Sequence, residues 1–154
     1  MIYNEYWQVV DAGVKESDLV TFFYEDQGVA SLEDGLYVLD SKLKDPAFVA
    51  RSAKFLRATL KGWNDAVKDP GEAAKIVVAA DPSGSATLKV QQRQMENVAK
   101  LITTAGTPKL GYLEPAAYER TVKVLLAAGS SPVIKKDPGK AAYSHVVWEA
   151  ATKK

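Results

Sequence analysis

The chain has 154 residues, of which 47% are hydrophobic and 25% charged, and twenty basic side chains against nineteen acidic ones leave a net charge of +1. The length fits one domain, and the composition excludes a disordered, collagen-like or coiled-coil chain. The near-neutral charge excludes a global attraction to nucleic acid or anionic lipid, so we expect no nucleic-acid partner. The absence of cysteine excludes disulfides, thiolate nucleophiles and cysteine metal ligands.

The termini and apolar runs carry no sign of export or membrane insertion. The first residues, MIYNEYWQVV, lack the basic and apolar regions of a signal peptide. The longest apolar runs, at 76–80 and 124–128, have five residues, far fewer than a membrane-spanning helix needs. If the chain is complete as written, we expect it to be cytoplasmic.

The first forty residues are predicted to contain one short helix and two strands. Residues 4–12 fit a helix that ends at Gly13, because glycine adopts the left-handed conformation that closes helices. The β-branched and aromatic runs LVTFFY at 19–24 and LYVL at 36–39 predict strands. Two strands do not make a stable sheet, so we expect their edges to pair with another copy in a homodimer.

An acidic residue followed by proline marks the expected start of most later helices. Such pairs begin at residues 45, 69, 81, 114 and 137. The acidic side chain can cap the helix, and proline suits the first helical position. After Asp69-Pro70, Glu72 completes a capping box.

Apolar spacing predicts one long helix and four shorter ones after residue 45. The long helix runs from Pro46 to about Val67, and Gly62 within it is expected to allow a close helix contact or a bend. Its apolar stripe consists of Val49, Leu56, Leu60, Trp63 and Val67. The shorter helices are expected over residues 71–80, 87–104, 115–128 and 139–152.

The segment FLRATLKGWNDAVKDPGEAAKIV at 55–77 closely resembles the C-terminal region of substrate-binding proteins of bacterial ABC importers. These proteins belong to the superfamily that recognises thiamine pyrimidine precursors, sulfonates and nitrate. YNEYWQVVDAG at 3–13 and YEDQGVASLEDGLYVL at 24–39 resemble its hinge region and return strand. QQRQM at 91–95 and AYSHVV at 142–147 resemble its later helices.

The resemblance implies an α/β fold, the helix-rich C-terminal part of a type II periplasmic-binding-protein-like fold with about five or six helices and about two or three short strands. Residues 1–154 are then a single domain, roughly the second half of a two-lobed protein. Residues 1–40 hold the hinge and return strands, and residues 41–154 form a helical layer. A fragment, a truncated reading frame and a rearranged protein all remain open.

The densest polar and aromatic cluster is Tyr3-Asn4-Glu5-Tyr6-Trp7. An aromatic ring can stack on a planar heterocycle, while Asn4 and Glu5 can orient it by hydrogen bonds. The resemblance implies that this cluster lies near the ligand cleft. The alternative is that Tyr6, Trp7 and Val10 form the apolar stripe of a short helix that Asn4 caps.

Gln27 and Gly28 are further candidates for the cleft, because a glycine there lets the backbone approach a ligand. The predicted ligand-binding residues are therefore Tyr3, Asn4, Glu5, Gln27 and Gly28. No catalytic residue, metal site or cofactor is predicted.

Three other motifs are more typical of structure than of function. The acidic residues Glu25, Asp26, Glu33 and Asp34 are expected to cap turns in solvent rather than to bind a cation. His145 is expected to be a packed or surface residue, since no nucleophile stands at an interpretable spacing from it. The turns SGS at 83–85 and PGK at 138–140 lack the spacing of a phosphate loop.

Three classes of function remain open. The resemblance implies a non-enzymatic solute-binding component of an ABC importer, located in the periplasm or outside the cytoplasm, with a small planar or anionic solute and an ABC permease as partners. The second class is a helical interaction or oligomerisation module without a ligand. The third is a relative of the pyrimidine-synthesising enzymes of the same fold, whose cysteine-rich motif this chain lacks.

Overall fold

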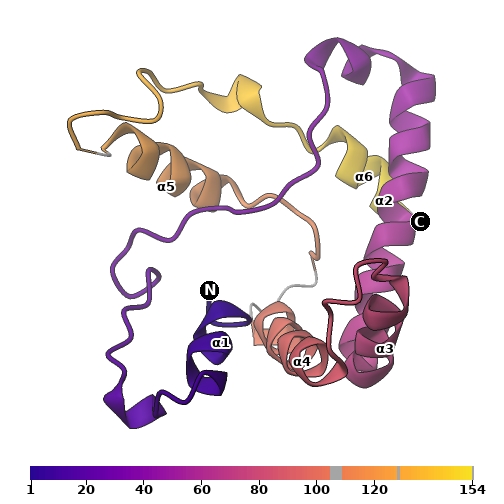
Figure 1. The fold of residues 1–154 in the computed structure, drawn as a ribbon. Coiled ribbons are helices and arrows are strands. Elements are labelled where there is room, and N and C mark those ends of the chain that lie inside the picture. The colour runs from indigo at the N-terminus through magenta and orange to yellow at the C-terminus, as the bar shows by residue number, and fades with distance from the viewer. Residues whose placement is uncertain (105–108, 128, 154) are drawn as a thin grey trace. The chain divides into compact units, whose positions relative to one another are not determined.

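The computed structural model describes residues 1–104, 109–127 and 129–153 (Figure 1). In that part of the chain there are six α-helices and three short 3-10 helices. The α-helices are α1 (Glu5–Asp11), α2 (Pro46–Lys68), α3 (Pro70–Ala80), α4 (Leu88–Thr104), α5 (Pro115–Leu126) and α6 (Val146–Thr152). The 3-10 helices are η1 (Glu16–Asp18), η2 (Asp40–Lys44) and η3 (Lys140–Ala142).

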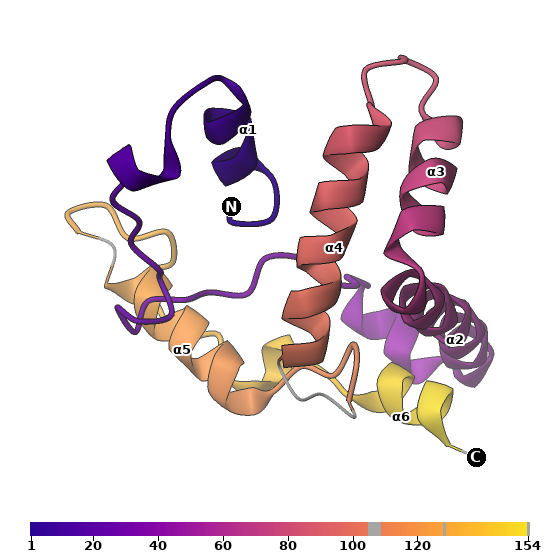
Figure 2. The same cartoon turned by 90° about the horizontal axis from the view of Figure 1, so that it is seen from below.

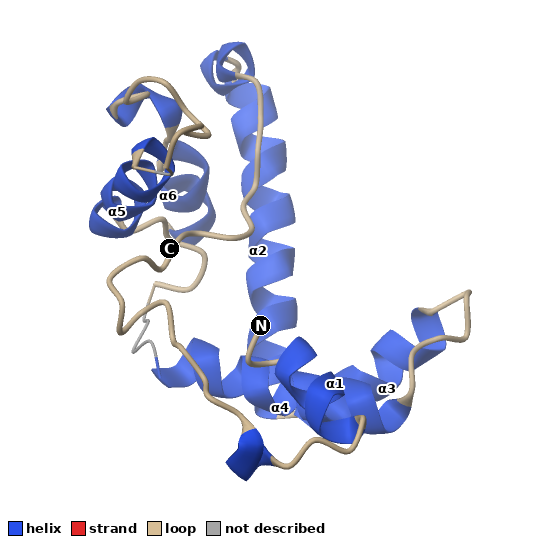
Figure 3. Cartoon of the chain, turned by 60° about the vertical axis from the view of Figure 1, so that its left-hand side comes forward, coloured by secondary structure: helices blue, strands red, loops and turns tan. Residues whose placement is uncertain are grey.

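The two predicted strands are absent, which corrects the α/β expectation to a helix-rich fold. Residues 19–23 and 29–39 have no regular secondary structure, and Figure 3 shows no strand within the described ranges. Their β-forming side chains face solvent: Phe22 is 72% exposed and Tyr37 is 83% exposed. A strand needs a partner for its backbone hydrogen bonds, and no described segment supplies one.

Three of the five acid-proline pairs start α-helices as predicted. Asp45 Oδ1 accepts a hydrogen bond of 2.8 Å from the amide of Ala47 at the start of α2. Asp69 Oδ1 accepts one of 2.9 Å from the amide of Glu72 at the start of α3. The remaining two pairs, at Asp81 and Asp137, do not start α-helices.

The predicted helix over 139–152 is divided into η3 and α6. Gly139 has a φ of +68°, and Tyr143 is extended with a φ of −139° and a ψ of 162°. The extended backbone lets the Tyr143 ring pack on Tyr118 and His145, with ring centroids 4.7 and 5.4 Å apart. Aromatic packing therefore interrupts the helix. The predicted end of the preceding helix, at residue 128, lies outside the described residues.

The chain divides into two compact units. Unit 1 comprises Met1–Val20 and Ala58–Leu110, and unit 2 comprises Thr21–Arg57 and Gly111–Lys154. That residues 1–154 form one domain with a hinge region up to residue 40 stays a prediction.

In unit 1, α3 packs against α4 to form a helical hairpin (Figure 2). Ala74 of α3 and Met95 and Ala99 of α4 are buried there. The turn between them is organised by Asp81, whose carboxylate accepts bonds from the amides of Ser83 at 2.8 Å and Ala86 at 2.7 Å. The SGS sequence is thus part of a structural turn.

In unit 2, hydrogen bonds connect segments that are far apart in sequence. Arg57 Nη1 donates to the carbonyl oxygens of Ala150 and Ala151, at 3.0 and 3.3 Å, near the end of α6. Arg120 Nε on α5 donates to the carbonyl of Ala30 at 2.9 Å. The amide of Leu32 donates to Thr121 Oγ1 at 3.0 Å.

The long helix differs from prediction at Trp63, and at Gly62 one of the two predicted roles is excluded. A Cβ atom added to Gly62 would meet nothing within 4 Å, so this glycine makes no close helix contact. Trp63 is 40% exposed, although its spacing assigned it to the buried stripe.

Among the described helices, none is both long and apolar enough to cross a membrane.

Candidate functional site

A small recess in unit 1 brings part of the predicted site together with α4. It is lined on one side by Tyr3, Asn4, Trp7, Gln8 and Asp11 and on the other by Val90, Arg93 and Gln94. The N-terminal cluster therefore contacts Arg93 and Gln94 of α4, about ninety positions later in the chain. The sequence did not predict either residue as part of the site.

Helical spacing explains which residues of the N-terminal segment line the recess. Asn4, Trp7, Gln8 and Asp11 are separated by three, four and seven positions, so they lie on one face of α1. Asn4 precedes the helix, but its side chain makes no capping bond. Its Oδ1 atom instead accepts a hydrogen bond of 2.7 Å from Gln8 Nε2.

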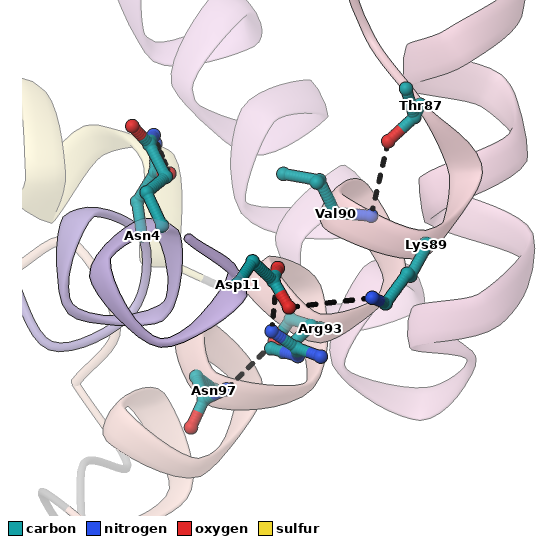
Figure 4. A network of polar contacts seen from close by, with 8 residues as sticks. Asn4, Asp11, Thr87, Lys89, Val90, Arg93 and Asn97 are labelled. Atoms are coloured by element: carbon teal, nitrogen blue, oxygen red, sulfur yellow. Dashed lines mark hydrogen bonds and ion pairs between the residues drawn. The ribbon is translucent and has the colours of Figure 1, made fainter. Parts of the chain in front are cut away.

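Asp11 connects α1 to α4 through two cations (Figure 4). Its carboxylate lies 2.9 Å from Arg93 Nη1 and 3.3 Å from Lys89 Nζ. The hydrogen bond from Arg93 holds the pKa of Asp11 below its usual range, with a further contribution from Lys89. The sequence could have indicated this pair of cations, because the four-residue spacing of Lys89 and Arg93 places both on one face of a helix.

Arg93 also contacts the aromatic part of the recess. Its guanidinium carbon lies 5.0 Å from the centroid of the Trp7 ring, within the range of a cation–π contact. The Trp7 Nε1 atom is buried and has no hydrogen-bond partner among the described residues. The recess therefore combines an aromatic surface, an unsatisfied donor and a cation.

Glu5 is less favourably placed than its neighbours. Its carboxylate is exposed and lies 2.9 Å from the Met1 ammonium, whose hydrogen bond lowers the pKa of Glu5. It does not line the recess.

Gln27 and Gly28 belong to unit 2, in a turn where their amides donate to the carbonyls of Phe23 and Glu25 at 3.3 and 3.0 Å. Gly28 has a φ of +69°, which favours glycine, and a Cβ atom there would have open space. Gly28 therefore provides the positive φ that this turn requires. That Gln27 and Gly28 line a ligand cleft stays a prediction.

The recess is small, and a larger hollow lies elsewhere in unit 1. The recess has a volume of about 10 Å³, room for about one water molecule and far below the roughly 300 Å³ of typical small ligand pockets. The hollow between α2, α3 and α4 has a volume of about 580 Å³, and its lining includes Trp63, Ile76, Val77 and Met95. Three acidic residues also line it: Asp65, Asp69 and Glu72. Lys61 pairs with Asp65, and Lys75 pairs with Glu72.

His145 is packed, as the sequence predicted. Its ring stacks on Tyr112 with centroids 4.2 Å apart, and Nε2 lies 2.8 Å from the carbonyl oxygen of Leu113. Within the described ranges, no three histidine, aspartate or glutamate side chains form a group that could hold a metal ion.

The comparisons with known proteins give one match. The family model described as "NMT1/THI5 like" matches residues 1–73. No curated protein and no solved structure matches the chain. The match includes all five predicted ligand-binding residues and ends within α3, so the resemblance of residues 91–95 and 142–147 to that family stays a prediction. Residues 1–73 are similar to the NMT1/THI5-like family of substrate-binding proteins, as the sequence motifs indicated.

Proposed function

We propose that this chain is a solute-binding component, or a part of one, of an ABC-type importer. The family similarity supports a solute-binding role in general. The observation that carries the more specific proposal is the recess at α1 and α4, where the family-matched residues Tyr3, Asn4 and Trp7 meet Arg93.

The residues of the recess favour a planar or anionic solute, such as a thiamine pyrimidine precursor. The rings of Tyr3 and Trp7 provide apolar surface for a heterocycle, and Asn4 provides an amide. Arg93 provides a planar cation that can stack on a heterocycle or pair with an anionic group. In the wider proposal, the solute is delivered to an ABC permease on the extracytoplasmic side of a membrane.

We expect the 154-residue chain to bind such a solute weakly. A two-lobed receptor gains affinity by enclosing its ligand, whereas this recess is smaller than a typical ligand pocket. A dissociation constant at about the millimolar level corresponds to only about 4 kcal/mol of binding free energy.

NMR titration with a thiamine pyrimidine precursor, a sulfonate and nitrate tests the proposal. The indole N–H signal of Trp7, assigned with Trp7→Phe, should shift on binding. Asn4→Ala should weaken binding by about 1–3 kcal/mol if Asn4 makes a buried hydrogen bond to the solute. Asn64→Ala is the matched control, because Asn64 is exposed on α2 and outside the recess.

Two results would contradict this assignment. Equal affinities of the Asn4→Ala and wild-type chains would place the solute elsewhere. Sub-micromolar binding by the isolated chain would show that enclosure by a further lobe is unnecessary.

The two other classes of function have different support. An enzymatic role is weakened by the absence of the cysteine-rich motif, although the NMT1/THI5-like family includes a pyrimidine-synthesis protein. An interaction module is favoured by the exposed apolar side chains of residues 21–40. Light scattering of the chain without peptide tests homodimerisation through this region, which the sequence predicts.

A further inference from the structure

Residues 21–40 of unit 2, which we call the acidic segment, combine one sign of charge with exposed apolar side chains. The segment contains five carboxylates and no lysine, arginine or histidine. Nine of its large apolar side chains are exposed: Phe22, Phe23, Tyr24, Val29, Leu32, Leu36, Tyr37, Val38 and Leu39. An exposed apolar surface of this extent is typical of an interaction site.

The middle of the segment is attached to α5, while its later part is free to pair. The contacts of Ala30 and Leu32 with Arg120 and Thr121 hold the middle in place (Figure 1). No described residue hydrogen-bonds to the backbone of Leu36, Tyr37 or Val38. Leu39 has a φ of −69° and a ψ of 134°, an extended conformation. Its carbonyl accepts a hydrogen bond of 2.9 Å from the amide of Lys42 in η2, so the unpaired backbone donors and acceptors of this β-forming sequence are those of Leu36–Val38.

Alternation along an extended chain places charge and apolar groups on the same side. Residues two apart share a face, so Asp34, Leu36, Val38 and Asp40 would lie together once the stretch is paired as a strand. A complementary strand needs apolar residues opposite Leu36 and Val38 and cations opposite the two aspartates. Asp40 already lies 3.8 Å from Lys44, but both side chains are about four-fifths exposed, so this pair competes weakly.

A second copy of the chain fits this surface poorly. If it pairs through the same stretch, it brings a second Asp34 and a second Asp40 to this edge. In the antiparallel register with Tyr37 opposite Tyr37, Asp34 faces Asp40 at both ends. Like charges opposite one another destabilise a strand pair.

We propose that residues 34–40, which are not a strand in the described chain, become one on pairing with a partner segment that has an apolar centre and basic ends. Main-chain hydrogen bonds supply affinity in this mode of binding, and the side chains supply selectivity. The two aspartates select a basic partner and disfavour self-association.

A charge-swap experiment tests the proposal with the full chain. The probe is the blocked peptide Lys-Thr-Val-Thr-Val-Thr-Lys, and its control carries glutamate at both ends. The basic peptide should bind and should protect the amides of Leu36–Val38 from hydrogen exchange. The acidic peptide should bind about tenfold or more weakly, since both cross-strand pairs become repulsive. Added salt should weaken binding of the basic peptide.

The variant Asp34→Lys/Asp40→Lys should reverse the preference and bind the acidic peptide more tightly. The matched control, Glu119→Lys/Glu149→Lys, changes the same number of charges at exposed positions of unit 2 and should keep the wild-type preference. Circular dichroism checks that both variants keep the wild-type helix content.

Three results would overturn the proposal. They are equal affinity for the two peptides, no protection of residues 36–38 by the basic peptide, and a dimer in light scattering without peptide at low salt. The last result would identify a second copy as the occupant.

Discussion

At the scale of single residues, Arg93 connects the two sides of the candidate site. Its guanidinium contacts both the Asp11 carboxylate and the Trp7 ring, so one side chain fixes the orientation of α1 against α4 within unit 1. It also occupies ring surface that a planar solute would need. Binding of a heterocycle to Trp7 therefore requires Arg93 either to move or to stack on the solute.

Replacing Arg93 tests its role in holding α1. Arg93→Gln removes the guanidinium from Asp11 and Trp7, so the amides of α1 should exchange faster with solvent and the fluorescence of Trp7 should shift. Lys89→Gln should have a smaller effect, because Lys89 is 72% exposed and its ion pair is longer, at 3.3 Å. Lys100→Gln, at an exposed position of α4, is the control. Unchanged exchange in α1 would show that other contacts hold it.

Asp81 gives a pH-dependent prediction for the turn between α3 and α4. Hydrogen bonds, first that from the Ser83 hydroxyl and then those from backbone amides, lower its pKa well below the usual 3.8. A lowered folded-state pKa means that the carboxylate stabilises the turn at pH above about 3.8 and that this stabilisation is lost as the pH falls further. NMR titration should therefore show a midpoint below 3.8 for Asp81.

The consequence should be local. Exchange of the Ala86 amide, which donates to Asp81 at 2.7 Å, should accelerate only in strong acid. In Asp81→Asn this acid-dependent change should be absent. A midpoint at or above the usual value would contradict the hydrogen bonding around this carboxylate.

At the scale of helices, small side chains form most of the interior. The buried apolar residues of the described chain are Ala53, Ala74, Met95, Ala99, Val122 and Ala151. Alanines allow close approach of α3 and α4 but bury little surface each. Two larger aromatic residues of α2, Phe55 and Trp63, are exposed by 60% and 40%.

Met95 and Trp63 should therefore differ in their contributions to stability. Met95 is 9% exposed, and Met95→Ala should lower the free energy of unfolding by about 2–5 kcal/mol. If Trp63 were buried, as its spacing predicts, Trp63→Ala would cost about 3–5 kcal/mol. Since Trp63 is 40% exposed, we now expect about 1 kcal/mol or less. Urea denaturation of both variants measures the difference, and equal losses would show that Trp63 is covered in solution.

At the scale of the whole molecule, the described residues bury too little apolar surface to resemble an ordinary domain. Among the residues whose burial is described, six apolar residues are buried, and no large side chain is completely buried. Each unit has its own internal contacts, and α2 contributes residues to both units. Exposed apolar side chains are found in the acidic segment and around the hollow at Trp63.

This low burial predicts a shallow denaturation curve. The m value scales with the surface exposed on unfolding, so the chain should have an m value in urea at or below about 1 kcal/mol per molar, the lower end of the range for small proteins. Urea titration followed by circular dichroism measures it. A value well above about 2 kcal/mol per molar would show that the chain buries much more surface in solution.

Local chemistry in the sequence determined most of the helices. Helices α2, α3 and α5 begin at the prolines after Asp45, Asp69 and Glu114, because the restricted φ of proline acts locally. The side chains of Asp45 and Asp69 add capping bonds, whereas that of Glu114 does not. The positive φ of Gly13 after α1 was likewise predictable. The motifs also indicated the family that matches residues 1–73.

Long-range contacts decided the remaining features. The runs at 19–24 and 36–39 have strong β propensity, but a strand exists only with a partner, and no described segment provides one. The helix over 139–152 was divided by the packing of Tyr143 on Tyr118, which lies in another helix. Arg93 joined Asn4 and Trp7 only through the fold, since residues about ninety positions apart have no spacing that reveals their contact. The sequence by itself thus determined where helices begin, while tertiary structure decided which side chains are buried and which cation meets the N-terminal cluster, because these depend on contacts between distant segments.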